Sequence, residues 1–211
     1  MIEAYFFDLD GTLVDTEILW VEALERFAQE QGYELSHEAA VAMVYGQAWP
    51  EVYELFQKRF SERTWSMQDM ADHLSRHFLR LRNSRDVRIK GSIALLRALS
   101  LSCPVAVVSG SYREDVKAAI DIMDIASSVR FYLGHEDYHP GKPHPACYLE
   151  AAKRLNVDPL RCVVFEDSQA GISAAKRAGM FCVALARQGR PAQDCSSADL
   201  VLEDLEFFRP T

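Results

Sequence analysis

YFFDLDGTLVD, residues 5–15, is the stretch of this sequence that decides the fold. It begins with three apolar aromatic residues, which predict a short strand buried on both faces. Asp8 and Asp10 follow, with Gly11 and Thr12 behind them. Side chains two residues apart on an extended chain point to the same side, and two close carboxylates repel unless a cation or a proton lies between them. The pair therefore indicates a metal site or a shared proton, with ordinary turn chemistry as the alternative.

Downstream of residue 85 the apolar pattern alternates between helical and extended segments, which predicts an α/β fold with a doubly wound parallel sheet. The expected helices cover residues 93–99, 116–123, 148–155 and 172–178, and the expected strands cover residues 105–108, 131–133, 162–165, 181–185 and 200–202.

Between the first strand and this alternating region, every apolar pattern has helical spacing. We expect four helices, the second over residues 37–44 with Ser36 as its cap and the third with Pro50 in its first turn. The domains expected are an α/β core of residues 1–15 and 85–211 and an inserted all-helical domain of residues 16–84. The predicted apolar stripes of the four helices include Trp20, Ala23, Leu24, Phe27, Val52, Leu55, Phe56, Met67, Met70 and Leu74.

Composition and charge limit the classes of function. The 211-residue chain carries a formal charge of −8, which disfavours nonspecific binding to nucleic acid or to anionic membranes. Its five cysteines are scattered and form no C-x-x-C pair, a pattern typical of reduced thiols in the cytoplasm. No segment approaches the roughly 20 apolar residues of a membrane span. We expect a soluble cytoplasmic protein, acting as a monomer or a weak dimer.

Three more groups of polar or charged residues lie where predicted strands or loops meet helices. Ser109 and Gly110 follow a strand and precede a helix, where a hydroxyl and backbone N–H groups suit a phosphate, although Ser111 could instead be an ordinary helix cap. Lys142 stands between glycine and proline, either as a phosphoryl-neutralising group or as a solvated surface lysine. Glu166 and Asp167 end a strand as hard oxygen ligands suited to Mg²⁺, or as acids favouring a helix start.

Taken together, these segments resemble the four signatures of the haloacid dehalogenase-like hydrolases, in the family's order. FFDLDGTLVDT resembles the first, a strand ending in Ser the second, GKPHPA the third and EDSQAGI the fourth. The resemblance implies a Rossmann-like core with a helical cap and a Mg²⁺-dependent phosphatase. Asp8 would be the nucleophile and Asp10 the general acid and base. Asp8, the backbone carbonyl of Asp10 and Asp167 would hold Mg²⁺, with Glu166 binding it directly or through water.

The same resemblance assigns the phosphoryl oxygens to Ser109, Gly110 and Lys142, with a further N–H group from Ser111. It implies an aspartyl-phosphate intermediate and a small phosphomonoester substrate, such as a sugar phosphate, a polyol phosphate or phosphoglycolate. Substrate choice in this family lies with the cap, so Trp20, Gly46 and Trp49 are candidate substrate residues. Packing between the cap helices is the alternative interpretation of both tryptophans.

Three alternatives remain at this point. Dehalogenases of the superfamily generally lack the second Asp, so Asp10 favours phosphate chemistry. Phosphosugar mutases related to β-phosphoglucomutase resemble this chain in EDSQAGI, but they usually carry Val at the position of Thr12 and His and Arg at sites corresponding to Trp20 and Trp49. These departures favour hydrolysis over intramolecular transfer. A binding or regulatory relative would be expected to lose one of the acids, and none is lost here.

Overall fold

The computed structural model describes residues 1–45, 47 and 49–210, with the Asn83 side chain left out. The chain forms two compact units, Met1–Val14 with Arg88–Thr211 and Asp15–Val87. The second unit starts one residue before and ends three residues after the expected residues 16–84. Among the described residues, no helix combines the length and the apolar character that crossing a bilayer requires.

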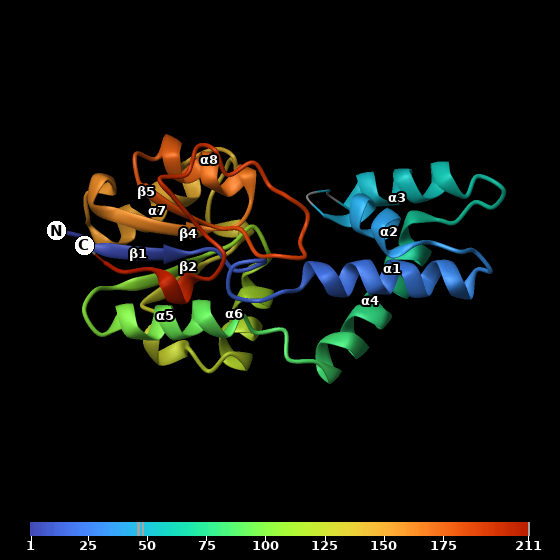
Figure 1. The fold of residues 1–211 in the computed structure, drawn as a ribbon, viewed down its shortest axis with the longest axis horizontal. Helices are drawn as coiled ribbons and strands as arrows, with labels where there is room; N and C mark the ends of the chain where they lie inside the picture. The colour runs from blue at the N-terminus through green and yellow to red at the C-terminus, as the bar shows by residue number, and fades with distance from the viewer. Residues whose placement is uncertain (46, 48, 211) are drawn as a thin grey trace. The chain divides into compact units, whose positions relative to one another are not determined.

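The first unit is built on a six-stranded, entirely parallel sheet, which confirms the predicted α/β fold (Figure 1). The strand order is β3-β2-β1-β4-β5-β6, so the first strand lies between β2 and β4. In a parallel sheet of this kind, a crevice opens at the carboxyl ends of the strands where the strand order changes direction, and here that point lies beside β1. The strands are β1 (Ala4–Phe7), β2 (Val105–Val108), β3 (Phe131–Leu133), β4 (Cys162–Glu166), β5 (Phe181–Leu185) and β6 (Leu200–Leu202).

Four α-helices cover the two faces of this sheet. Figure 1 shows α5 (Lys90–Ser100) and α6 (Arg113–Ile122) on one face, with α7 (Ala146–Leu155) and α8 (Gln169–Arg177) on the other. Because helices cover both faces, β1, β2 and β4 are buried along their whole length. Short 3₁₀ turns complete this unit at Ala126–Ser128, His135–Asp137, Pro159–Arg161 and Leu205–Phe207.

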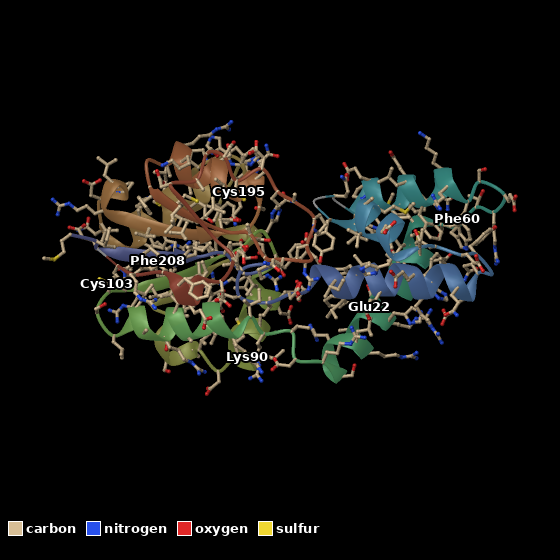
Figure 2. All side chains as sticks on the ribbon, viewed as in Figure 1. Glu22, Phe60, Lys90, Cys103, Cys195 and Phe208 are labelled. Atoms are coloured by element: carbon tan, nitrogen blue, oxygen red, sulfur yellow. The ribbon has the colours of Figure 1, made fainter. Side chains whose placement is uncertain are left out.

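Aromatic side chains fill the sheet face that carries α5. Phe7 stacks on Phe165 with ring centroids 4.4 Å apart. Phe208, labelled between the sheet and α5 in Figure 2, meets Phe165 edge to face at 5.0 Å. Rings in such arrangements contribute about 0.5–1.5 kcal/mol beyond the area they bury. This packing fixes β1 and β4 side by side just before their terminal acids.

The second unit consists of helices α1 (Glu17–Glu30), α2 (His37–Val44), α3 (Trp49–Arg59) and α4 (Met67–Ser84). The Ser36 hydroxyl accepts a hydrogen bond from the Ala39 N–H and so caps α2, as predicted. The core of this unit is aromatic: Phe27 lies 5.4 Å from Phe56 and 5.8 Å from Trp65, ring centroid to ring centroid.

Two predicted stripe residues of this unit are exposed instead. Leu55 is 38% and Met67 is 40% exposed. Trp65 enters the core from the loop between α3 and α4, and its ring lies against Phe56, the neighbour of Leu55. Helical periodicity cannot reveal a core residue that a loop contributes, so the pattern did not predict Trp65.

Candidate active site

The carboxyl ends of β1 and β4 carry the first acids of the site. Phe7 pairs with Phe165 across the two strands, so Asp8 and Glu166, one residue further along each strand, lie beside each other. The Asp8 N–H donates to the Phe165 carbonyl at 2.9 Å, which holds Asp8 at the sheet edge. On the other side of β1, Phe7 pairs with Val107, two residues before Ser109.

Lys142 forms the charged centre of the site. Its ammonium group donates to Asp8 Oδ1 and to Glu166 Oε1, both at 2.5 Å, although 134 and 24 residues separate the partners in the chain. The three side chains are almost fully buried, with exposures of 11% for Lys142, 9% for Asp8 and 0% for Glu166. The peptide bonds before Pro140 and Pro143 in the loop that carries Lys142 are both cis.

Burial and neighbouring charges shift the pKa values of Asp8 and Lys142. Burial first, and the neighbouring Glu166 charge second, raise the pKa of Asp8 to about 8, against the lowering effect of Lys142. Burial alone would lower the pKa of Lys142, but the charges of Asp8 and Glu166 outweigh it and raise that pKa well above its usual value. Lys142 therefore remains a cation throughout the physiological pH range.

Glu166 has hydrogen-bond donors on both of its oxygens. Oε1 accepts from Lys142 and from the Tyr148 hydroxyl, the latter at 2.8 Å. Oε2 accepts from the Asp167 N–H at 3.1 Å and from the Ser168 N–H and hydroxyl at 3.2 and 3.0 Å. A carboxylate with about four lone-pair positions is saturated by five donors. Its orientation is therefore strongly determined.

Gly171 makes room for Glu166 in this orientation. A Cβ atom at position 171 would lie 1.7 Å from Glu166 Oε1 and 1.9 Å from its carboxyl carbon. We predict that Gly171→Ala displaces the Glu166 carboxylate, lowers turnover at least about tenfold and reduces stability by about 1–3 kcal/mol, as overpacking of a core does. Steady-state kinetics and chemical denaturation measure the two effects.

The matched control for this prediction is Gly141→Ala, because a Cβ atom there would have nothing within 4 Å. We expect wild-type turnover and stability from it. Full activity in Gly171→Ala would contradict the role given to the saturated Glu166 carboxylate.

Asp167 completes a cluster of three acids. Asp8, Glu166 and Asp167 each offer a carboxylate oxygen within 4.8 Å of those of the other two. The Thr12 hydroxyl donates to Asp167 Oδ1 at 3.3 Å. Gly11 has φ +85°, and a Cβ atom there would lie 1.9 Å from Asp167 Oδ2, so only glycine fits this turn.

This donor set fits Mg²⁺. Asp8 and Asp167 offer hard oxygen donors, the ligands that Mg²⁺ prefers, and together with Glu166 they leave an excess of negative charge against a single lysine. Burial is the main cause of the raised pKa of Asp8, and the negative charge of Glu166 raises it further. A bound divalent cation would offset that charge.

The Asp10 carboxylate accepts hydrogen bonds from two serine hydroxyls. Ser111 Oγ donates to Asp10 Oδ2 at 2.7 Å, and Ser109 Oγ donates to the same oxygen at 3.4 Å. The Ser111 N–H in turn donates to Ser109 Oγ at 2.9 Å. The cap residue of α6 is Tyr112 without a side-chain cap, so the helix-cap alternative for Ser111 is wrong. Gly110 lies exposed between the two serines.

Sequence reasoning missed two site residues, Tyr138 and Tyr148. The Tyr138 hydroxyl donates to the Ser109 carbonyl at 2.7 Å, and the Tyr148 hydroxyl donates to Glu166. Buried tyrosines in apolar patterns normally belong to the core, so the sequence carries no signal that separates these two from packing residues. Only their position after the strand ends and near Lys142 could have drawn attention to them.

The tryptophans proposed for substrate binding lie in the helical unit. Trp20 stacks on Phe78 with ring centroids 4.1 Å apart, so packing accounts for one face of its ring. Trp49 begins α3, and Gly46 lies outside the described residues. Both tryptophans border a cavity of about 380 Å³, whose described lining is Glu17, Trp20, Val44, Gln47, Trp49, Val52, Ala71, Leu74 and Ser75.

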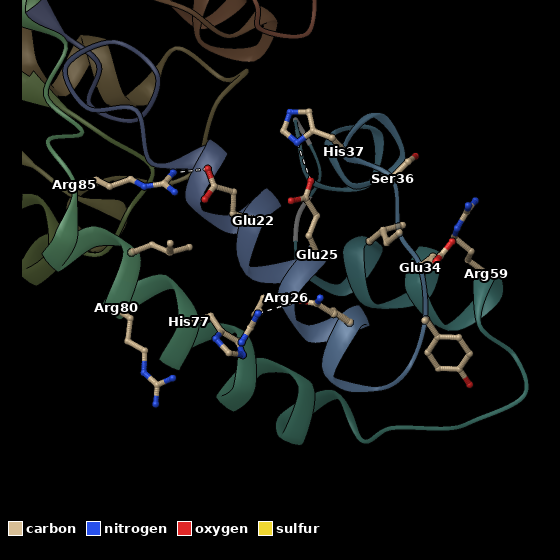
Figure 3. A pocket seen from close by; sticks show the side chains of 14 residues that line it. Glu22, Glu25, Arg26, Glu34, Ser36, His37, Arg59, His77, Arg80 and Arg85 are labelled. Atoms are coloured by element: carbon tan, nitrogen blue, oxygen red, sulfur yellow. Dashed lines mark hydrogen bonds and ion pairs between the residues drawn. The ribbon is translucent and has the colours of Figure 1, made fainter.

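A larger, open cavity of about 1060 Å³ in the same unit carries mixed charges (Figure 3). Glu22 pairs with Arg85 at 2.5 Å, and Glu25 pairs with the His37 ring at 2.7 Å. Figure 3 shows the Arg80 side chain directed away from His77. This cavity offers ion pairs on a solvated face and no organised anion site.

Comparison with known proteins agrees with this fold. The fold is a parallel α/β core with strand-end carboxylates around a buried lysine, and the haloacid dehalogenase-like hydrolase model matches residues 5–185. The chain therefore belongs to the haloacid dehalogenase-like hydrolases, which confirms the family prediction and makes it an enzyme.

Individual relatives are phosphatases and a mutase. Validoxylamine A 7′-phosphate phosphatase of Streptomyces hygroscopicus subsp. limoneus is 30% identical over 99% of this chain and 97% of its own length. The 6-phosphogluconate phosphatase of Escherichia coli is 31% identical over 85% of this chain and 80% of its own. The structure of β-phosphoglucomutase from Clostridium difficile superposes with a TM-score of 0.75 at 25% identity, covering 99% and 94% of the two chains.

Proposed function

We propose that this enzyme is a Mg²⁺-dependent phosphatase that hydrolyses a small phosphorylated metabolite through an aspartyl-phosphate on Asp8. The observation that carries the proposal is the buried Lys142 ammonium, which donates to Asp8 Oδ1 and Glu166 Oε1 beside Asp167. A cation held against a carboxylate at the open edge of a parallel sheet is suited to neutralising a transferred phosphoryl group. The named relatives that hydrolyse phosphomonoesters support the same activity.

In this proposal the residues act in two steps. A carboxylate oxygen of Asp8 attacks phosphorus, and the bond to the leaving oxygen breaks while Asp10 gives that oxygen a proton. Asp10, now a carboxylate, takes a proton from water, whose oxygen attacks phosphorus and releases phosphate from Asp8. Splitting the hydrolysis into two displacements replaces one slow step by two faster ones.

The remaining residues bind the phosphoryl group or orient the reacting side chains. Ser109, the Gly110 N–H and Lys142 bind phosphoryl oxygens, and the Ser111 hydroxyl orients Asp10. Asp8, Asp167 and the Asp10 carbonyl would hold Mg²⁺, which would supply positive charge against the carboxylates and the phosphoryl group. We assign Glu166 to Lys142 rather than to the metal, because five donors already occupy its oxygens.

We further propose that the helical unit is the cap and that its cavity of about 380 Å³ selects the substrate. Among the described lining residues there is no Lys, Arg or His, so a second phosphate would lack a counterion there. The indoles of Trp20 and Trp49, with the polar groups of Glu17 and Gln47, suit a neutral hydroxylated sugar or polyol better than an acid such as phosphoglycolate. The missing cation also weighs against the mutase alternative when its substrate is a bisphosphate.

A screen of phosphomonoesters tests this proposal. We expect Mg²⁺-dependent phosphate release, with sugar and polyol phosphates hydrolysed at higher kcat/KM than phosphoglycolate, and loss of at least about 99% of activity in EDTA that Mg²⁺ restores. The same samples, assayed for conversion of β-glucose 1-phosphate into glucose 6-phosphate, test the mutase alternative. Isomerisation faster than phosphate release would contradict the assignment as a hydrolase.

A further inference from the structure

One buried hydroxyl at the site has no part in the steps above. Tyr148, on the first turn of α7, is fully buried, and its hydroxyl donates to Glu166 Oε1 at 2.8 Å. A carboxylate can only accept, so the phenol is the donor of this bond. Tyr148 therefore shares one oxygen atom with Lys142, which donates to the same Oε1.

This shared oxygen links the position of Tyr148 to that of Lys142. The Lys142 ammonium divides its hydrogen bonds between Asp8 and Glu166, each at 2.5 Å. The Tyr148 hydroxyl satisfies part of the negative charge on Oε1. Without it, Lys142 would be the one remaining side-chain donor to that oxygen among the described residues, and it would be drawn toward Glu166 and away from Asp8.

We propose that Tyr148 is a positioning residue of the phosphoryl site: its hydroxyl holds Glu166 so that Lys142 stays divided between Glu166 and Asp8. The inference rests on the proposed function, because the position of Lys142 affects turnover only if it binds the transferred phosphoryl group. It goes beyond that function by adding a residue that touches neither substrate nor metal.

The ring of Tyr148 has packing roles of its own, which the test must leave unchanged. It stacks on Phe6 with centroids 6.5 Å apart, and the Lys142 ammonium lies 5.4 Å from its ring centroid. Tyr148→Phe keeps both contacts and removes only the hydroxyl. Any effect of this variant on turnover therefore reports the bond to Glu166.

The expected result of Tyr148→Phe is a kcat lowered about tenfold together with a raised KM, since the displaced Lys142 ammonium binds the phosphoryl group less well both in the ground state and in the transition state. Inorganic phosphate, titrated calorimetrically in the presence of Mg²⁺, should bind more weakly by a similar factor. Tyr5→Phe is the matched control, because Tyr5 is equally buried at 3% exposure but lies at the start of β1. It should keep the wild-type values.

A double-mutant cycle separates positioning from a merely structural effect. In a Glu166→Gln background, Tyr148→Phe should change kcat and phosphate affinity less than about twofold, because the charge it acts through is gone. A wild-type kcat and phosphate affinity in Tyr148→Phe, or equal losses in both backgrounds, would overturn the inference. A wild-type protein that binds inorganic phosphate yet hydrolyses no phosphomonoester would contradict only the proposed function, and phosphate affinity would still decide the role of Tyr148.

Discussion

Asp8→Asn is expected to reduce phosphomonoester hydrolysis by at least about 10⁴-fold, because removing a nucleophile disables every later step that depends on it. The amide has the shape of the carboxylate and can still accept a hydrogen bond from Lys142, so the fold should be unchanged. Steady-state kinetics with Mg²⁺ measures the loss, and circular dichroism checks the fold. Activity near that of the wild type would refute the assignment of Asp8 as nucleophile.

The same variant has a defined effect on stability. In the metal-free protein, burial and the Glu166 charge raise the pKa of Asp8 from 3.8 to about 8. A carboxyl whose pKa is raised on folding costs stability as pH rises from its unfolded pKa to its folded one. The free energy of unfolding of Asp8→Asn should therefore increase, relative to that of the wild type, as pH rises from about 4 to about 8. Asp121→Asn, an exposed i,i+4 partner of Lys117, is the control and should show neither effect.

Lys142→Met is expected to have the second largest effect. It keeps most of the side-chain length but leaves Asp8 and Glu166 without the ammonium that lies 2.5 Å from both. Removing one partner of a buried charge pair costs about 3–5 kcal/mol. Turnover should fall by at least about 10³-fold, because the transferred phosphoryl group loses its charged donor. Kinetics and urea denaturation in EDTA measure the two losses.

A compensating change distinguishes the two losses of Lys142→Met. Adding Glu166→Gln removes one of the two uncompensated charges, so the double variant should recover stability but not turnover. The stability deficit of Lys142→Met should also shrink as pH falls, because a carboxyl with a raised pKa takes up its proton in the folded state. Recovery of turnover in the double variant would contradict the role given to Lys142.

The site residues that could be predicted from the sequence are those that follow the end of a strand. A strand is recognisable from its apolar run, and parallel strands bring their carboxyl ends to one edge, so the pattern could place Asp8, Ser109 and Glu166 there, while their functional roles depended on the family resemblance. Lys142 depended on resemblance to a family signature, since no periodicity marks a loop. The structure brings it within 2.5 Å of Asp8.

The remaining contacts depended on tertiary geometry that the pattern does not contain. Ser111 satisfied a capping rule, yet Tyr112 is the cap residue of α6 and the Ser111 hydroxyl donates to Asp10 instead. Tyr148 has the spacing of a core residue, and its ring stacks on Phe6 in the core. Its hydroxyl nevertheless donates a hydrogen bond to Glu166. Trp65 reaches the core of the helical unit from a loop.

The most direct test of the account is to trap the phosphorylated enzyme. Rapid mixing with Mg²⁺ and the best substrate of the screen, followed by acid quenching and borohydride reduction, converts an aspartyl-phosphate into homoserine that peptide mass spectrometry can locate. The account predicts homoserine at position 8 in the wild type and none in Asp8→Asn. Homoserine at another residue, or a wild-type enzyme that turns over substrate without any reduced aspartate, would contradict it.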